Sequence, residues 1–299
     1  MLIGIHTGRY SLLTKYVQKY IDILTANDIK YVLLDSSSPD FWEEIKEVDY
    51  FIFHYAHYDW DKQVAEAILP IIQNEYGIKC HPEQRSCWQF NDKIKEYYLL
   101  KSHGLPMTES WVFYDKKKAM NWIKTCDYPI VFKLRKGSGG NNVLLIKNIK
   151  DAKRAVRIMF TRGVRPNGFR FRGSIFYKDF NIAQYGREIA NRIVKRIKSR
   201  PIDNYWGVEK GYILFQKFLP NNRFDTRVTV MGNRAFTYVR FNRANDFRSI
   251  CEMSYATSDF LLNGSPGYWD DKLKWHSGHY WPQYFDLVDL LGIELKQPE

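Results

Sequence analysis

A lysine at the end of an apolar segment, followed by a glycine-rich loop, is the part of this sequence best suited to phosphate chemistry. Residues 130–132 are apolar and rich in strand formers, Lys133 follows them, and residues 143–146 are a second run of the same kind. The loop between the two runs contains Gly137, Ser138, Gly139 and Gly140. Glycine tolerates positive φ and lets backbone N–H groups turn onto an anion. The segment therefore predicts a strand, a loop and a strand that bind a polyphosphate, with Lys133 supplying positive charge.

Neither of the two common phosphate-binding motifs matches this loop. A P-loop has its lysine after the glycines and continues into a helix, whereas Lys133 precedes the glycines and a strand follows. The dinucleotide-binding motif needs a helix after its third glycine, and position 142 is Asn. Arg135 and Lys136 add charge behind Lys133. An exposed basic hairpin with a flexible tip is the alternative interpretation, and both stay open on these residues alone.

A second charged group is expected on a β-hairpin over residues 223–240. If Gly232 and Asn233 form a two-residue turn, the cross-strand partners are 231/234, 229/236, 227/238 and 225/240. Asp225 then lies opposite Arg240, with Arg227 diagonal to it on the same face. Three charges on one strand face are not typical of a core. The alternative is a solvated face with one modest surface ion pair.

The elements that precede the loop alternate between strand and helix. Strands are predicted at residues 2–5, 31–34 and 50–53, and helices at 12–24, 41–48 and 65–72. This alternation predicts a parallel sheet covered on both faces, whose ligands lie beyond the carboxyl ends of the strands. His54 and His57 follow one such end and are candidate substrate contacts, although histidines on loops are commonly just solvated.

The middle of the chain continues the α/β pattern. Asn91 or Asp92 is expected to cap a helix that runs through Lys93 and ends near Gly104. A strand is predicted at 111–113, a helix at 116–125 and an apolar strand at 212–215.

Composition excludes several classes of protein. No stretch approaches the ~20 apolar residues of a membrane span, and residues 1–10 lack the apolar run of a signal sequence. The four cysteines are scattered without metal-ligand spacing, which favours reduced thiols and a cytoplasmic protein. At 299 residues, the chain is long enough for two or three subdomains.

The net charge of +12 is concentrated, because residues 151–200 hold fourteen Lys and Arg against three acids. Within them, residues 181–200 have isoleucines at helical spacing with basic residues between, and residues 163–173 are predicted to be an arginine-rich loop. Such a segment could bind nucleic acid, a membrane surface or an acidic substrate. We favour an acidic small-molecule or polymeric substrate over nucleic acid. A solvated helix that packs its isoleucines on the core is the simplest alternative.

The order of the motifs carries a family resemblance. Asn91-Asp92-Lys93, Gly104-Leu105-Pro106, the strand ending at Lys133 and the glycines of 137–140 resemble, in that order and spacing, the ATP-grasp superfamily. Ribosomal-protein glutamate ligases and glutathione synthetases are the most similar group. The resemblance implies that Lys93 and Lys133 contact the phosphates of ATP and that the loop 137–142 closes over them.

Further site residues are implied in the same way. The hinge between the two ATP-grasp subdomains, whose backbone binds the adenine edge, would be Gln216, Lys217, Phe218 and Leu219, with Lys217 in place of the usual acid. A plain buried strand is the alternative there. The substrate and γ-phosphate contacts would be Asp225, Arg227, Arg240 and Arg248.

The implied architecture is an α/β protein in three parts: a Rossmann-like N-terminal domain at 1–88 and two ATP-grasp subdomains at 89–205 and 206–299. The implied activity is an ADP-forming carboxylate–amine ligase that uses ATP and Mg²⁺. A phosphotransferase and a nucleotide- or polyanion-binding protein without turnover are the alternatives. A product assay would separate them, because ADP with free phosphate indicates a ligase and ADP with a phosphorylated product a kinase.

The expected magnesium ligands are where this chain departs from the family. ATP-grasp enzymes generally end with an acidic residue followed by a Glu-x-Asn strand, and Mg²⁺ prefers such oxygen ligands. After Arg248 the chain has acids that include Glu252 and Asp259, but no Glu-x-Asn. Residues 284–294 resemble the last helix and turn of the family, with Asp286 and Asp289 expected simply on a polar helix face. We therefore leave the metal ligands unassigned and expect ATP binding with weak or absent magnesium-dependent turnover by these residues alone.

Overall fold

The computed structural model describes two compact units, one of Met1–Trp88 with Asn222–Glu299 and one of Gln89–Asn221. The described residues are 1–7, 15–54, 59–137, 142–166, 207–231, 234–242, 249–256, 267–269, 275–277 and 281–296, with Gly186, Ala190 and Val194. None of the helices within these ranges is long and apolar enough to cross a membrane. The three-part division at 88/89 and 205/206 stays a prediction.

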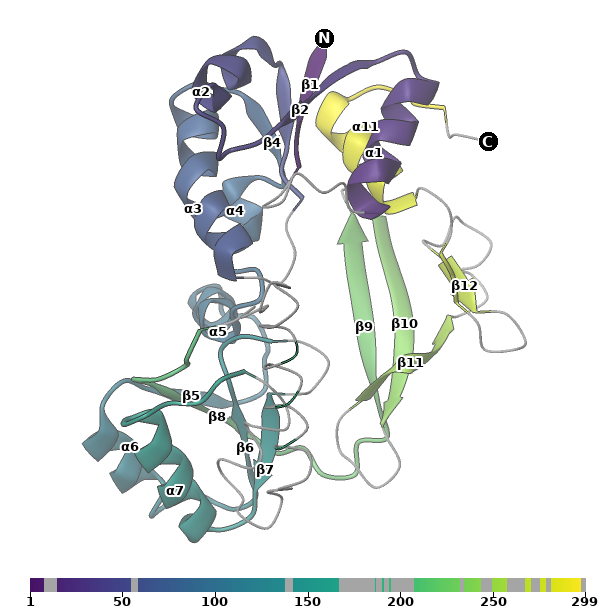
Figure 1. Cartoon of the computed structure of the whole chain (residues 1–299). Helices are drawn as coiled ribbons and strands as arrows, with labels where there is room; N and C mark the ends of the chain where they lie inside the picture. Colours follow the sequence, from purple (N-terminus) through teal and green to yellow (C-terminus); the bar gives the residue numbers. More distant parts are fainter. Residues whose placement is uncertain are drawn as a thin grey trace. The chain divides into compact units, whose positions relative to one another are not determined.

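The first unit contains the parallel sheet that the sequence predicts. Its strands are β1 (Leu2–His6), β2 (Lys30–Leu34), β3 (Tyr50–Ile52) and β4 (Lys79–His81). They pair in parallel in the order β2-β1-β3-β4. Strands β1, β2 and β4 are labelled in Figure 1. The helices are α1 (Lys15–Ala26), α2 (Phe41–Glu44) with the 3-10 turn Ile45–Glu47, α3 (Asp59–Asn74) and α4 (Gln84–Cys87). The predicted alternation of strand and helix is confirmed.

Both faces of this sheet are buried, because successive strand side chains point to opposite sides. Ile5 and Ile52 pack with α1, whereas Phe51 packs with α2 and α3. The face of Ile5 is also covered by α11 (Trp281–Leu291), whose Leu287 is fully buried there. The expectation of a sheet covered on both sides is therefore confirmed.

Helix α11 is tied to the N-terminal part of its unit by polar contacts. The Tyr20 hydroxyl donates to Asp286 Oδ2 at 2.5 Å, and His81 Nε2 lies 3.4 Å from the same oxygen. Asn27 donates to the Lys296 carbonyl at 2.7 Å. We expected Asp286 simply on a polar helix face, and this was wrong: its carboxylate joins α11 to α1 and β4.

The same unit contains antiparallel strands β9 (Phe224–Met231), β10 (Arg234–Asn242) and β11 (Ser249–Ala256), in the order β11-β10-β9. The predicted hairpin register is confirmed at all four positions, from Met231 opposite Arg234 to Asp225 opposite Arg240. Two short strands, β12 (Gly267–Trp269) and β13 (Trp275–Ser277), pair with each other.

The second unit is a helix layer on an antiparallel sheet. The strands are β5 (Ser110–Phe113), β6 (Ile130–Lys133), β7 (Val143–Ile146) and β8 (Ile213–Lys217), in the order β5-β8-β6-β7. The helices are α5 (Lys93–Ser102), α6 (Lys116–Trp122) and α7 (Ile149–Met159). Phe132, Phe215 and Ile146 belong to one core with buried residues of α6 and α7. The two units together make a mixed α/β protein with parallel and antiparallel sheets.

Candidate functional site

Lys133 lies on the sheet face away from the α6–α7 core. Phe132 is in that core, and the pleat turns the next side chain to the other side. Gln216 of β8 shares that face, because it pairs with Val131, two residues before Lys133. The Lys133 ammonium donates to Gln216 Oε1. Burial lowers the pKa of Lys133, although the nearby Glu96 carboxylate partly opposes this.

The orientation of the Gln216 amide follows from a third residue. The Ser110 hydroxyl donates to the Thr108 carbonyl at 2.8 Å, so its oxygen can only accept from Gln216 Nε2, 2.9 Å away. The amide oxygen must therefore point to Lys133. This chain of contacts joins β5, β8 and β6 and positions the Lys133 ammonium.

Lys93 reaches the same region from the start of α5. Asp92 caps this helix, since its Oδ1 accepts from the backbone N–H groups of Ile94 and Lys95 at 3.1 Å. The Lys93 N–H donates to the Arg135 carbonyl at 3.0 Å, which holds the helix start against the chain that leaves β6. The Lys93 ammonium donates to the Gly137 carbonyl at 2.7 Å. The predicted cap at 91 or 92 is confirmed at Asp92.

The two lysines that sequence analysis selected are close enough to repel each other. The pKa of Lys93 is lowered to about 8, first by burial and second by the charge of Lys133. Each ammonium has three N–H donors and uses one within the described residues, on Gly137 O and Gln216 Oε1 respectively. Two half-buried cations that keep further N–H donors within the described residues form an arrangement that a bound anion would stabilise.

The first glycine of the loop is required by its surroundings. Gly137 has φ +101°, and a Cβ there would lie 2.0 Å from Asn142 Nδ2. Its N–H donates to Asn91 Oδ1 at 3.0 Å, and Asn142 Nδ2 donates to the Lys136 carbonyl at 3.0 Å. Asn142 is buried, and its Oδ1 has no hydrogen-bond partner within the described residues. Ser138, Gly139 and Gly140 lie outside the described residues.

The other two basic residues of the loop are paired with acids, which sequence reasoning missed. Arg135 Nε lies 2.6 Å from Asp92 Oδ2, and Lys136 Nζ lies 3.6 Å from Glu209 Oε1. Tyr212 joins the two pairs, because its hydroxyl donates to Glu209 Oε2 at 2.7 Å and accepts from the Arg135 N–H at 2.8 Å. Arg135 and Lys136 thus stabilise the base of the loop with their charges balanced. No local pattern identifies Glu209 as a partner, since it lies over seventy residues further along the chain.

The proposed hinge residues lie at the end of β8. Gln216 and Lys217 are the last residues of this strand, and Phe218 and Leu219 follow it. The Lys217 N–H donates to the Glu109 carbonyl at 2.8 Å, and its ammonium lies 3.7 Å from the Glu109 carboxylate. Leu219 is 53% exposed.

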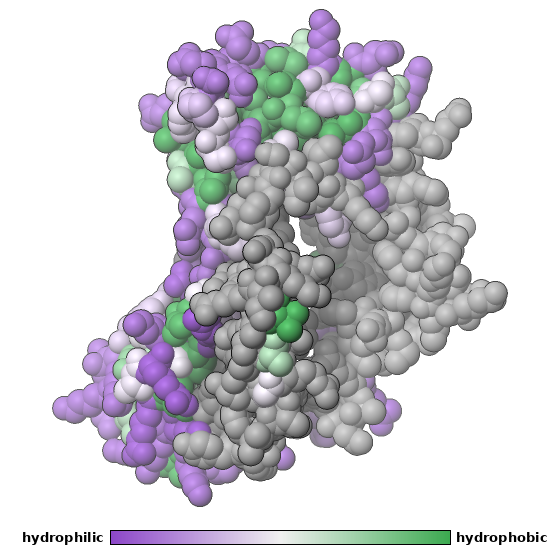
Figure 2. All heavy atoms as spheres, in the orientation of Figure 1, coloured by the Kyte–Doolittle hydropathy of each residue, from purple (hydrophilic) through white to green (hydrophobic). Residues whose placement is uncertain are grey.

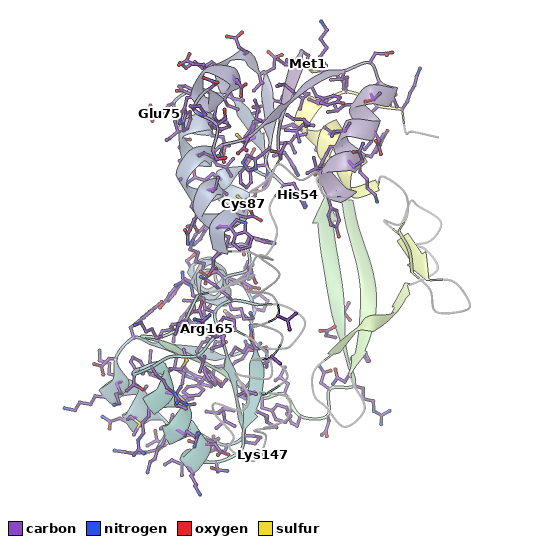
Figure 3. All side chains as sticks on the ribbon, in the orientation of Figure 1. Met1, His54, Glu75, Cys87, Lys147 and Arg165 are labelled. Carbon is purple, nitrogen blue, oxygen red and sulfur yellow. The ribbon has the colours of Figure 1, made fainter. Side chains whose placement is uncertain are left out.

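The remaining predicted contacts belong to the first unit. Arg240 is the register partner of Asp225, and Arg227 is the register partner of Tyr238. Arg248 and His57 lie outside the described residues. His54, labelled in Figure 3, stacks on Tyr16 with ring centroids 5.0 Å apart, and burial is the main cause of its lowered pKa.

The residues present fit a polyphosphate better than a metal. Lys93 and Lys133 supply converging positive charge, whereas no group of three or more His, Cys, Asp or Glu that could hold a metal ion occurs within the described ranges. The magnesium ligands stay unassigned.

No family model and no curated protein matches this sequence. Solved structures do resemble the fold. One is a RimK domain ATP-grasp protein from Sphaerobacter thermophilus, 14% identical, with a TM-score of 0.47 over 99% of this chain and 84% of that chain. Another is a D-cycloserine synthetase, 12% identical, with a TM-score of 0.48 over 100% of this chain and 84% of that one.

A third is an N5-carboxyaminoimidazole ribonucleotide synthetase from Thermotoga maritima, 15% identical, with a TM-score of 0.47 over 100% of this chain and 77% of the other. At such low identities and TM-scores, neither an activity nor a substrate of these proteins carries over to this chain.

Proposed function

We propose that this chain is an ATP-grasp protein whose second unit binds the phosphates of ATP through Lys93, Lys133 and the loop 137–142. The finer architecture that we propose is a Rossmann-like N-terminal domain with two ATP-grasp subdomains. One observation carries the proposal: two half-buried lysines from separate elements meet at the base of a glycine-rich loop, and both have lowered pKa values.

An anion explains this arrangement better than a structural role does. Each buried ammonium is destabilised by lost hydration, and the two also repel each other. A core that served stability alone would pair each of them with a carboxylate, as the same unit does for Arg135 and Lys136. A triphosphate would supply that negative charge. Its oxygens would also accept hydrogen bonds from the N–H donors of Lys93 and Lys133 that the described residues leave unused.

The reaction that we propose is ADP-forming ligation of a carboxylate to an amine. A substrate carboxylate oxygen attacks the γ-phosphorus, the bond to the β-phosphate oxygen breaks, and ADP leaves. The amine then attacks the acyl phosphate carbon, and phosphate leaves with the loss of a proton from nitrogen. Lys93 and Lys133 would neutralise charge on the transferred group, a role that is mainly electrostatic. Arg227, Arg240 and Arg248 are proposed contacts of an acidic substrate and the γ-phosphate.

Nucleotide binding without turnover is the second candidate, and it is favoured because the expected metal ligands have not been identified. The sequence lacks the Glu-x-Asn strand, and no metal-binding cluster occurs within the described residues. A phosphotransferase on the same scaffold remains the third candidate.

Two measurements test the proposal. Calorimetry with ATP should show binding that Lys133→Ala weakens by about 10- to 150-fold, the equivalent of losing one charge-assisted hydrogen bond of roughly 1.5–3 kcal/mol. The matched control is Lys147→Ala, an exposed lysine just after β7. Equal ATP affinity in both variants would refute the site.

The second measurement is a product assay with ATP, magnesium, and pooled carboxylates and amines. ADP with free phosphate and a condensed product supports the ligase. ADP with a phosphorylated hydroxyl supports the phosphotransferase. Release of AMP would contradict the ATP-grasp proposal, and binding without any product would leave the non-catalytic candidate.

A further inference from the structure

Basic charge is unevenly distributed along the chain. Residues 1–88 hold eight Lys and Arg against thirteen Asp and Glu, whereas residues 115–166 hold fourteen against three. Lys133, Arg135 and Lys136 are part of the candidate site. The other eleven basic residues of 115–166 lie on, between or beside α6 and α7. The excess is therefore local to one layer of the second unit.

Helix α7 separates apolar and basic residues into two opposite stripes. Its core-facing side chains, all essentially inaccessible, are Ala152, Ala155, Val156 and Met159. The basic residues follow the spacing i, i+3, i+4 and i+7 and are Lys150, Lys153, Arg154 and Arg157. At 1.5 Å rise per residue, this basic stripe extends about 10 Å along the helix. Asp151, the one acid of α7, is hydrogen-bonded to Asn148 at the helix start.

The neighbouring helix and connections extend the same surface, which we call the α6–α7 basic face. Figure 2 shows hydrophilic residues gathered over these helices. Beyond the basic stripe of α7, the exposed members of the face are Lys116, Lys117, Lys118, Lys124, Lys147, Arg162 and Arg165. Within the described residues, Lys150, Lys153 and Arg157 form no ion pair.

This face cannot serve the nucleotide site, because the sheet lies between them. Phe132 and Phe215 pack toward α6 and α7, and strand alternation turns Lys133 and Gln216 to the other side. Any anionic partner of the α6–α7 basic face is therefore different from the phosphates at Lys133.

We propose that the α6–α7 basic face binds the sugar–phosphate backbone of a nucleic-acid duplex, independently of sequence. Duplex interfaces are polar and strongly positive, and regularly spaced phosphates complement a basic stripe on a helix. A protein interface needs apolar or aromatic anchors, and a membrane-surface helix needs exposed apolar residues. No large hydrophobic residue of α6 or α7 is exposed, because the described part of these helices uses them in the core. Single strands need stacking platforms, and only Tyr114 is exposed beside α6 within the described part of this layer.

The test compares two triple charge reversals with equal effect on net charge. One changes Lys150, Lys153 and Arg157 to Glu, and the control changes the exposed Lys30, Lys46 and Lys79 of the first unit to Glu. The probes are labelled RNA and DNA duplexes of about two helical turns. Their binding is measured by fluorescence anisotropy at salt concentrations from about 50 to 200 mM. ATP affinity, measured on the other sheet face, reports that the variants are folded.

We expect the wild type and the control to bind duplex, with affinity falling on the order of 100- to 1,000-fold across this salt range. The α7 reversal should abolish binding but keep ATP affinity. A neutralising variant of the same three residues to Gln should reduce the salt slope by about 2 to 3, one for each lost phosphate contact. Tighter binding of the RNA duplex or of the DNA duplex would identify which of the two the face recognises.

Three results would overturn the proposal. Equal loss in both reversals would show an effect of net charge alone. Binding to phosphatidylserine vesicles or polyglutamate, with none to either duplex, would show a different partner. Absence of duplex binding by the wild type at low salt would return the face to simple solvation.

Discussion

The pH dependence of ATP binding tests the two lysines most directly. In the free protein the pKa of Lys93 is lowered to about 8, by burial and by Lys133. A bound triphosphate supplies opposite charge and would raise this pKa toward its usual value. The protonated form binds the anion, so the favourable interaction is fully present only well below pH 8. It is lost as the pH rises through the lowered pKa, because binding must then take up a proton.

The magnitude follows from the protonated fraction of Lys93. With a pKa of about 8, this fraction falls from about three quarters at pH 7.5 to about one tenth at pH 9.0. ATP should therefore bind about 8-fold more weakly at pH 9.0, a loss of about 1.3 kcal/mol. The phosphates contribute little to this change, since their last pKa of about 6 lies below the window.

Calorimetry in buffers of different ionisation enthalpy measures both the affinity and the proton uptake. The control is Lys93→Arg, which keeps the charge but does not titrate in this window, so its affinity should change much less with pH. If Lys93→Arg does not bind, Lys93→Met should bind weakly and without proton uptake. An affinity of the wild type that stays constant from pH 7.5 to 9.0, or equal slopes in wild type and Lys93→Arg, would refute the reasoning.

Four further outcomes are expected. Gly137→Ala should lower the free energy of unfolding by at least about 1–2 kcal/mol in urea titrations, because φ is positive and the added Cβ meets Asn142 Nδ2; an unchanged midpoint would contradict this geometry. Gln216→Leu should weaken ATP binding several-fold by releasing the Lys133 ammonium, whereas Gln216→Glu should raise the pKa of Lys133. Calorimetry that also measures proton uptake distinguishes a changed pKa of Lys133 from a packing effect. Tyr20→Phe should cost about 1–2 kcal/mol of stability, because it removes the hydrogen bond that holds α11; chemical denaturation checks it, and a loss near zero would show that the apolar contacts of α11 suffice. If the second candidate, nucleotide binding without turnover, is correct, the chain should bind ATP but form little ADP with magnesium; robust ADP formation in a coupled assay would instead support the ligase and direct the search for metal ligands to Glu252 and Asp259.

Local patterns in the sequence identified much of the architecture. Short apolar runs predicted the strands of residues 2–53, and helical spacing helped to predict the helices before residue 72. The antiparallel register from Met231–Arg234 to Asp225–Arg240 followed from counting outward from a turn. The helix cap at Asp92 and the strand that ends at Lys133 are likewise short-range features. These succeeded because caps, turns and periodicity depend on residues only a few positions apart.

The balance of charge was decided by the tertiary structure. Sequence reasoning grouped Arg135 and Lys136 with Lys133, but packing pairs the first with Asp92, 43 residues away, and the second with Glu209. Asp286 is separated from Tyr20 by 266 residues, and no local pattern joins them. Sheet pleat and helix packing likewise put the basic stripe of α7 and the Lys133 ammonium on opposite sides of one sheet. A side chain's charge is visible in the sequence, but its burial and its neighbours, which set its pKa and its availability to a ligand, arise only when distant segments pack together.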